Sequence, residues 1–276
     1  LGESTMKRIR NIVGNVPDPD ELYGREELLR HLWRQIRGNN ILLLAPRRFG
    51  KTGVMRHLLD RPDPQFLPLY FDLEDADSPE EFVWRVIREV LSQQPLRRTL
   101  QAARQLPKVI GNWVKDTFDE IEFEGAKVKF KQSIGEDWVA PARRLLLDLE
   151  KAEPTLIFIF DELPAMLDTF RRKLGTDQAR QFMAWFRAVR LQQKDRLRRH
   201  RFLVGGSTGI DLILRRLDVP DKLNDFERLY VEPIRRDEAT KLVKDLAASM
   251  EVQLSEEVAE RILNLMTPHV PYFIHL

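Results

Sequence analysis

The sequence predicts an α/β fold with a mainly parallel sheet and helices on both of its faces. Two continuous apolar runs, Ile41–Leu44 and Leu156–Phe160, are typical of strands that are buried on both sides. Strand and helix patterns also alternate along the chain, as they do in proteins built from strand-helix-strand units. The two observations together favour one doubly covered sheet over an all-helical or all-β fold.

Four elements are expected after the first apolar run. Residues Thr52–Leu59 predict a helix, and Phe66–Leu73 predict a second strand. Ser78–Glu81 then combine a serine N-cap, a proline at the first helical position and a glutamate three residues after the serine. This is a capping box, so a helix should run from there to about Leu91. The charged segment Gln93–Thr117 is interpreted most simply as helical.

A β-hairpin inserted into the parallel core is predicted over Glu120–Ile134. Apolar residues alternate there with charged ones around Gly125-Ala126. Two roles remain open for this insertion, namely contact with a partner and a structural flap. Residues Trp138–Lys151 then predict a helix that leads into the second apolar run.

The last third of the chain predicts further elements of the same core. Residues Gln178–Gln193 carry aromatic residues at helical spacing, which indicates core packing, with Arg187 and Arg190 exposed. A strand is expected over Arg201–Gly205 and another over Arg228–Glu232. Two amphipathic helices should follow, over Asp237–Met250 and Ser255–Met266. The predicted organisation is a core over residues 1–234 and a small helical lid over residues 235–276.

The first apolar run leads into Ala45-Pro46-Arg47-Arg48-Phe49-Gly50-Lys51-Thr52, which matches most of the phosphate-binding pattern G-x-x-x-x-G-K-[ST]. Gly50 would let backbone N–H groups turn toward phosphate oxygens, Lys51 would reach the β- and γ-phosphates, and Thr52 would hold Mg²⁺. The first glycine of the pattern is replaced by Ala45, so the loop must open without the freedom of a glycine. This segment predicts a nucleotide site.

The second apolar run ends in two adjacent carboxylates, Asp161 and Glu162. In a phosphate-loop ATPase the first acid orients Mg²⁺ and the second polarises the attacking water. The alternative is a strand that ends in two solvated acids before a turn at Pro164. Because both motifs occur in the expected order, a nucleoside triphosphatase is the favoured interpretation.

The strand expected over Arg201–Gly205 ends in Gly206-Ser207-Thr208-Gly209. A hydroxyl there could sense the γ-phosphate or position water, which makes Ser207 and Thr208 candidates. A tight turn that caps the next helix is an equally open interpretation.

Composition excludes several classes of function. The chain has 276 residues, a net charge of +2 and no cysteine, so disulfides, thiolate metal sites and cysteine nucleophiles are excluded. Basic clusters at Arg171–Lys173 and Lys194–Arg201 are more typical of solvated helix faces than of a nucleic-acid surface. No segment has the length of a membrane span and no secretory signal is present, so we expect a cytoplasmic protein that does not contact membranes.

With these motifs placed, the chain resembles the prokaryotic AAA-type ATPases often called the archaeal ATPase family, which are related to origin-recognition and STAND ATPases. The resemblance covers nearly the whole chain, and its features are these: Leu22-Tyr23-Gly24-Arg25-Glu26, Pro46 to Thr52, Phe160-Asp161-Glu162-Leu163-Pro164, Gly205-Gly206-Ser207 and Pro271-Tyr272. It implies a P-loop sheet of the ASCE type with core strands in the order 5-1-4-3-2. It also implies that ATP and Mg²⁺ are the cofactors.

The resemblance assigns roles to particular residues. The segment Tyr23, Gly24 and Arg25 would line the adenine pocket, and the absence of an Asn-Lys-x-Asp sequence agrees with ATP over GTP. The nucleotide-binding set that it implies is Tyr23, Gly24, Arg25, Pro46, Arg47, Arg48, Phe49, Gly50, Lys51, Thr52 and Gly53. Related enzymes complete their site with an arginine finger, for which Arg215 and Arg216 are the candidates, with surface salt bridges as the alternative.

Two functions from different classes follow. The favoured one is Mg²⁺-dependent ATP hydrolysis that drives a conformational switch, with Thr52 and Asp161 on the metal and Glu162 activating water. The alternative is an ATP-binding scaffold with low turnover that recruits DNA or a protein. Relatives commonly continue into a further C-terminal domain, so a homo-oligomer and a DNA or protein partner bound through such a domain are also expected.

Overall fold

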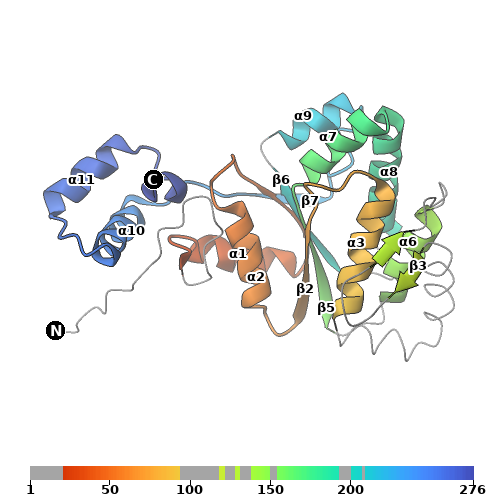
Figure 1. Ribbon diagram of the computed structural model, residues 1–276, viewed down its shortest axis with the longest axis horizontal. Helices are drawn as coiled ribbons and strands as arrows, with labels where there is room; N and C mark the ends of the chain where they lie inside the picture. The colour runs from red at the N-terminus through yellow and green to blue at the C-terminus, as the bar shows by residue number, and fades with distance from the viewer. Residues whose placement is uncertain are drawn as a thin grey trace. The chain divides into compact units, whose positions relative to one another are not determined.

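The computed structural model describes residues 21–93, 118–121, 128–130, 138–149, 154–192, 200–206 and 209–276 (Figure 1). Several sequence predictions lie outside these residues, namely Ser207, Thr208, all but the first residue of the helix expected over Gln93–Thr117, most of the basic cluster Lys194–Arg201 and part of the range expected for the hairpin. The chain divides into two compact units. Unit 1 comprises Leu1–Asp63, Leu203–Thr208 and Phe226–Leu276, and unit 2 comprises Pro64–Phe202 and Gly209–Asp225. The boundary expected at residue 234 stays a prediction.

Five strands form one parallel sheet, and helices flank it. The strands are β1 (Asn40–Leu44), β2 (Phe66–Asp72), β5 (Thr155–Asp161), β6 (Arg201–Gly206) and β7 (Phe226–Tyr230). Their order in the sheet is β2-β5-β6-β1-β7. When the five core strands are numbered along the chain this is the expected order 5-1-4-3-2, so the predicted fold class is confirmed. A separate antiparallel pair, β3 (Phe118–Ile121) and β4 (Val128–Phe130), confirms the inserted hairpin.

The strand registers set the level of the loops at the carboxyl ends of the strands. In unit 1, β1 pairs in parallel with both β6 and β7, and Leu44 is opposite Gly206 on one side and Tyr230 on the other. In unit 2, β2 pairs with β5 so that Asp72 is opposite Asp161. Each pair of strands therefore ends level, and its following loops start at the same edge.

The helices that the sequence predicts within the described residues agree with the structure to within a few residues. The described helices are α1 (Glu26–Ile36), α2 (Lys51–Asp60), α3 (Pro79–Ser92), α6 (Val139–Asp148), α7 (Leu163–Lys173), α8 (Thr176–Gln192), α9 (Ile210–Arg216), α10 (Arg236–Ser249), α11 (Glu256–Leu265) and α12 (Pro271–Ile274). Of these, α1, α7 and α12 were not predicted. At the start of α3 the Ser78 side chain accepts from the Glu81 N–H at 3.2 Å, as a capping box requires. The Glu81 carboxylate, however, accepts from the Asp77 N–H and not from that of Ser78.

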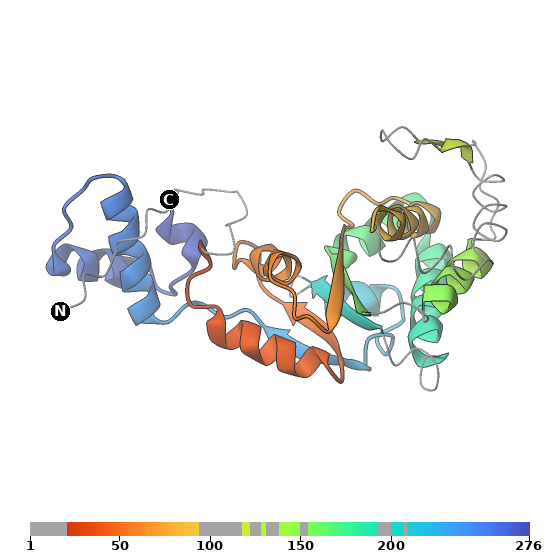
Figure 2. The same ribbon diagram turned by 90° about the horizontal axis from the view of Figure 1, so that it is seen from below.

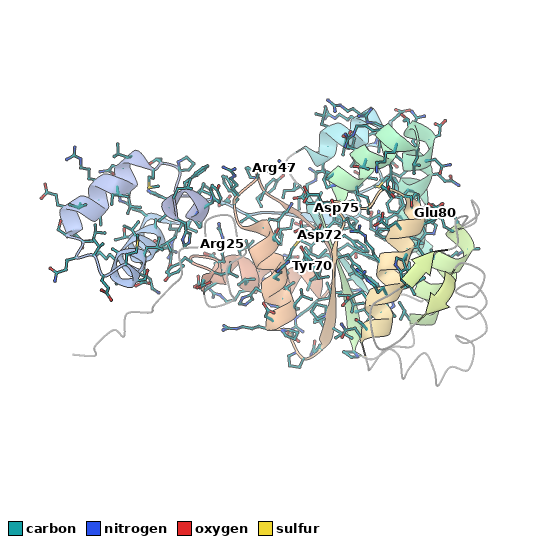
Figure 3. All side chains as sticks on the ribbon, viewed as in Figure 1. Arg25, Arg47, Tyr70, Asp72, Asp75 and Glu80 are labelled. Atoms are coloured by element: carbon teal, nitrogen blue, oxygen red, sulfur yellow. The ribbon has the colours of Figure 1, made fainter. Side chains whose placement is uncertain are left out.

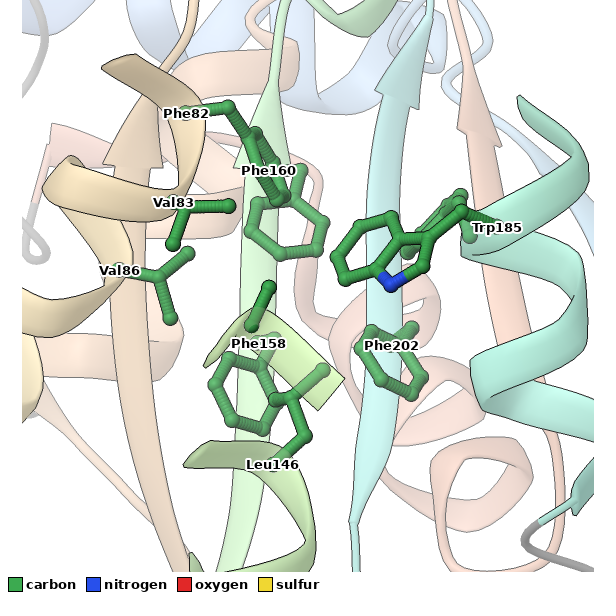
Figure 4. A pocket seen from close by; sticks show the side chains of 10 residues that line it. Phe82, Val83, Val86, Leu146, Phe158, Phe160, Trp185 and Phe202 are labelled. Atoms are coloured by element: carbon green, nitrogen blue, oxygen red, sulfur yellow. The ribbon is translucent and has the colours of Figure 1, made fainter. Parts of the chain in front are cut away.

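Aromatic side chains form the core of unit 2. Side chains from α3, α6, β5, β6 and α8 line one apolar pocket in this core, and Figure 4 shows them with Phe82, Phe160, Trp185 and Phe202 among those labelled. Rings in this core, Phe182 of α8 included, lie edge-on, tilted or stacked against one another, with centroids 5.0 Å to 6.2 Å apart in five of the pairs. The interpretation of the aromatic residues of α8 as core, and not as a cofactor site, is confirmed.

The exposed position expected for Arg190 is wrong. Its side chain is fully buried, and its guanidinium donates two hydrogen bonds to Asp225, at 2.9 Å and 3.0 Å. It also lies over the ring of Phe186, 4.2 Å from the centroid. The sequence could not indicate this burial, because Asp225 is 35 residues away along the chain.

In unit 1, α10, α11 and α12 form a small helical group with its own apolar core (blue in Figures 1 and 2). That core includes Leu242, Leu246 and Leu263 from the helices and Tyr23 from the segment before α1. The segment that follows β7 enters this group by way of Ile234, whose N–H donates to the carbonyl of His269. Among the described residues, no helix is long and apolar enough to cross a membrane.

Candidate functional site

The loop between β1 and α2 has an unusual backbone. Arg48 and Gly50 both adopt left-handed conformations, with φ of 74° and 84°. Two such residues within three positions turn successive peptide groups in a way that creates an anion-binding concavity, and the loop leads directly into the N-terminus of α2. The backbone therefore fits bound phosphates.

Ala45, which replaces the first glycine of the motif, has no left-handed conformation. It is buried and extends the sheet, since its N–H donates to the Gly206 carbonyl at 3.3 Å. The loop does not need the backbone freedom of a glycine at position 45, because its left-handed residues are Arg48 and Gly50. An alanine is thus compatible with the loop.

Lys51 and Thr52 begin α2, and Gly53 follows them. Only 8% of Lys51 is exposed, which is unusual for a lysine. Thr52 is half-buried, and Gly53 is buried. A buried cation and a hydroxyl at a helix N-terminus are donors and ligands suited to phosphate and Mg²⁺.

The three loop residues before Phe49, namely Pro46, Arg47 and Arg48, are exposed. The Arg48 guanidinium lies over the ring of Tyr272 in α12, 4.4 Å from the centroid. The Pro271-Tyr272 segment was part of the resemblance without an assigned role, and the structure brings Tyr272 to the loop.

Tyr23 and Gly24 pack against the helical group of unit 1. The Tyr23 hydroxyl donates to Asp245 Oδ2 at 2.7 Å, and burial together with this bond raises the tyrosine pKa well above its usual range. Gly24 has a φ of 61°, and an added Cβ would lie 3.0 Å from Ile234. These two residues join the start of α1 to α10.

Arg25, which Figure 3 labels, is 4% exposed, and its guanidinium donates hydrogen bonds to backbone oxygens. Nη1 donates to the Glu232 carbonyl at 2.6 Å, and Nη2 donates to the Phe49 carbonyl at 3.0 Å. Burial lowers the pKa of Arg25 to about 10, so the side chain is still charged at neutral pH.

In unit 2, Asp161 and Glu162 differ in their surroundings. Asp161 is 2% exposed at the end of β5, so the interpretation of two solvated acids does not hold for it. Its Oδ1 accepts from the Glu162 N–H at 3.0 Å. Glu162 has a φ of 58° and lies directly before α7, in which Pro164 occupies the first turn. A left-handed glutamate costs of the order of 1 kcal/mol, and such residues cluster at functional sites.

Tyr70 on β2, which Figure 3 labels, is a site residue that the sequence patterns did not indicate. Its hydroxyl donates to Asp161 Oδ2 at 3.2 Å. The available signal was a tyrosine within the otherwise apolar strand Phe66–Phe71, two residues before its acidic end at Asp72.

Arg215 and Arg216, the candidates for an arginine finger, are exposed in the last turn of α9. Arg216 is near enough to Asp168 to help lower the pKa of that carboxyl, although the hydrogen bond from Arg171 has the larger effect.

The basic cluster at the end of α7 is largely neutralised, because Arg171 and Arg172 pair with Asp168, and Lys173 pairs with Asp77. Ser207 lies outside the described residues.

No protein-family model matches the chain. No curated protein matches its sequence either. Solved structures do match. The Walker-type ATPase PABY2304 of Pyrococcus abyssi is 18% identical and superposes with a TM-score of 0.58. The match covers 93% of this chain and 66% of that ATPase.

Two further solved structures superpose similarly. Cdc6p of Pyrobaculum aerophilum is 16% identical with a TM-score of 0.53, and the match covers 96% of this chain and 62% of that protein. ORC1 of Aeropyrum pernix, solved in complex with DNA, is 19% identical with a TM-score of 0.51, and the match covers 87% of this chain and 52% of that protein. This chain has the fold of the archaeal ATPases related to origin-recognition proteins. It spans about half to two thirds of the length of these proteins.

Proposed function

We propose that the protein binds ATP with Mg²⁺ and hydrolyses it. The observation that carries the proposal is the loop before α2, where two left-handed residues lead into a helix whose first residue is a buried lysine. A neighbour of the same fold, ORC2 of Aeropyrum pernix, was solved in complexes with ADPNP and ADP; it is 14% identical with a TM-score of 0.53. That protein's nucleotides support the proposal for this one.

Each site residue has a proposed role. Lys51 and the amides that follow Arg48 would stabilise negative charge on the β- and γ-phosphates. Thr52 and Asp161 would hold Mg²⁺, since hydroxyl and carboxylate oxygens are ligands that this ion prefers. Bound Mg²⁺ would neutralise phosphate charge as it develops. Glu162 would accept a proton from the attacking water.

The proposed consequence of hydrolysis is a conformational switch of the helical group α10 to α12. Two contacts within unit 1 support it, because Arg48 of the loop lies over Tyr272 and Tyr23 bonds to Asp245. Bound ATP would hold the loop and these helices in one arrangement, and release of phosphate would loosen it.

The test is steady-state ATP hydrolysis by the parent, Lys51→Ala and Glu162→Gln, with ATP affinity measured for all three. We expect Lys51→Ala to lose affinity, and Glu162→Gln to keep affinity but lose turnover by about a hundredfold or more. Glu74→Gln, which changes an exposed acid in the same unit, is the matched control and should behave like the parent. Tight binding without turnover in the parent would instead support the ATP-binding scaffold, and absence of binding would refute the proposal.

An arginine finger from Arg215 or Arg216 of a neighbouring copy is proposed as the activating element. Both are exposed, as a residue acting on another subunit must be. Turnover per site should then rise with protein concentration in the parent and not in Arg215→Ala or Arg216→Ala. A rate per site that is independent of concentration would remove this role.

DNA is the candidate partner that follows from the fold, because the ORC1 neighbour was solved with DNA. The ion pairs that neutralise Arg171, Arg172 and Lys173 argue against the end of α7 as its binding surface. Binding to duplex DNA measured at several salt concentrations tests this partner, since phosphate contacts predict affinity that falls steeply as salt rises.

A further inference from the structure

The contacts of Arg25 differ from those expected of a residue that lines the adenine pocket. We propose that Arg25 is a positioning residue that presets the phosphate-binding loop by holding the Phe49 carbonyl. The inference rests on the proposed function, and it assigns Arg25 to the phosphates rather than to the adenine.

The first step concerns the peptide group between Phe49 and Gly50. Arg25 Nη2 donates to the Phe49 carbonyl at 3.0 Å. In a planar trans peptide the carbonyl and the next N–H point in opposite directions. With the Phe49 oxygen directed at Arg25, the Gly50 N–H must therefore point away from Arg25, and its direction is fixed.

The second step concerns the peptide group on the other side of Gly50. The Gly50 carbonyl accepts from the Val54 N–H at 3.1 Å, as part of the first turn of α2. Both peptide groups that flank Gly50 are thus held by different partners while the residue itself has a φ of 84°. Glycine is the residue with the most conformational freedom to lose, so holding it in advance removes a cost from phosphate binding.

The third step concerns what holds Arg25. Its other terminal nitrogen, Nη1, donates to the Glu232 carbonyl at 2.6 Å, just beyond β7. The side chain is 4% exposed, and a buried guanidinium is stable only where its donors are satisfied. Two bonds from a rigid planar group to two separate segments leave Arg25 little freedom to move, which is what a fixed support for Phe49 requires.

The test separates phosphate recognition from adenine recognition. Inorganic tripolyphosphate carries the phosphates without a base, and adenosine carries the base without phosphates. Each is used to displace a fluorescent ATP analogue from the parent, Arg25→Met and Arg25→Lys. Arg30→Met, which removes an exposed arginine from the same helix region, is the matched control.

We expect Arg25→Met to weaken tripolyphosphate and ATP alike, by about tenfold or more, while adenosine displaces as it does in the parent. Arg25→Lys keeps the charge and can reach one carbonyl, so it should lose less affinity for tripolyphosphate and ATP than Arg25→Met. It should also fold, and it keeps the test valid if Arg25→Met does not fold. Unchanged tripolyphosphate affinity in both variants, or a loss confined to adenosine, would overturn the role. A parent that binds none of the three probes would refute the ATP site as well, whereas a parent that binds while the variants match it refutes only the role of Arg25.

Discussion

The hydroxyl of Tyr70 on β2 donates a hydrogen bond to Asp161 Oδ2 on the neighbouring strand β5, at 3.2 Å. The other carboxylate oxygen, Oδ1, accepts from the Glu162 N–H. Both oxygens of a buried aspartate are therefore held by neighbours within unit 2, and its orientation is set before any ligand is bound. Such supporting contacts are known to tune the affinity of carboxylates for metal ions.

The first prediction concerns this contact. Tyr70→Phe should raise the Mg²⁺ concentration needed for half-maximal ATP hydrolysis by about threefold to tenfold, because Asp161 loses one support. Mn²⁺ affinity, measured by electron paramagnetic resonance with a non-hydrolysable ATP analogue, should weaken to the same extent. Tyr230→Phe is the control, since Tyr230 is 54% exposed. Equal metal dependence in all three proteins would show that Tyr70 has no part in metal binding.

The second prediction concerns Arg48 and Tyr272. Replacing the ring in Tyr272→Leu should weaken ATP binding by about twofold to fivefold, because a cation–π contact contributes roughly 0.5 to 1 kcal/mol. Tyr272→Phe keeps an aromatic face and should stay close to the parent. The neighbouring change Phe273→Leu serves as the control for nonspecific effects on α12. If the leucine and phenylalanine variants at 272 bind alike, the ring does not act through Arg48.

The third prediction concerns stability. Arg190→Met leaves the Asp225 carboxylate without its guanidinium partner and should lower the free energy of unfolding by about 3 kcal/mol, measured by urea denaturation. The paired change with Asp225→Asn should cost less than the sum of the two single changes. Asp177→Asn, which breaks the exposed pair with Arg180, should cost less than about 1 kcal/mol. A cost for Arg190→Met as small as that of this control would contradict the prediction.

The fourth prediction concerns pH. Burial lowers the pKa of His275 below its usual 6.5, with Glu21 opposing the shift. The unfolded chain therefore takes up a proton at higher pH than the native protein does. This makes the native state lose stability as the pH falls below about 6.5. His275→Leu should remove part of the decrease in melting temperature between about pH 7.5 and about pH 5.5.

The control for this pH effect is His31→Gln, which changes a histidine on α1. The same dependence on pH in the parent and in His275→Leu would exclude His275 as its source.

Local patterns in the sequence were enough to predict the layout of the chain. The apolar runs before Pro46 and Asp161 indicated buried strands because they are continuous, and the period of the aromatic residues on α8 indicated a helix with a buried face. Gly50 at the end of the loop was expected to have special backbone freedom, and it does. Each of these features depends on neighbours within a few residues.

The partners of individual side chains were decided only by the tertiary structure. Arg25 bonds to Glu232, which lies 207 residues away along the chain, and Tyr70 bonds to Asp161, which lies 91 residues away. The buried Arg190 bonds to Asp225, which lies 35 residues away. Nothing in the few residues around an arginine or a tyrosine specifies such a partner, because it is the packing of strands and helices that brings them together. The sequence by itself thus determined most of the elements, the strand order through its resemblance, and the position of the loop between β1 and α2. The folded chain determined which side chains support that loop and the buried aspartate, since hydrogen bonds between distant segments form only after the backbone has fixed their distance and direction.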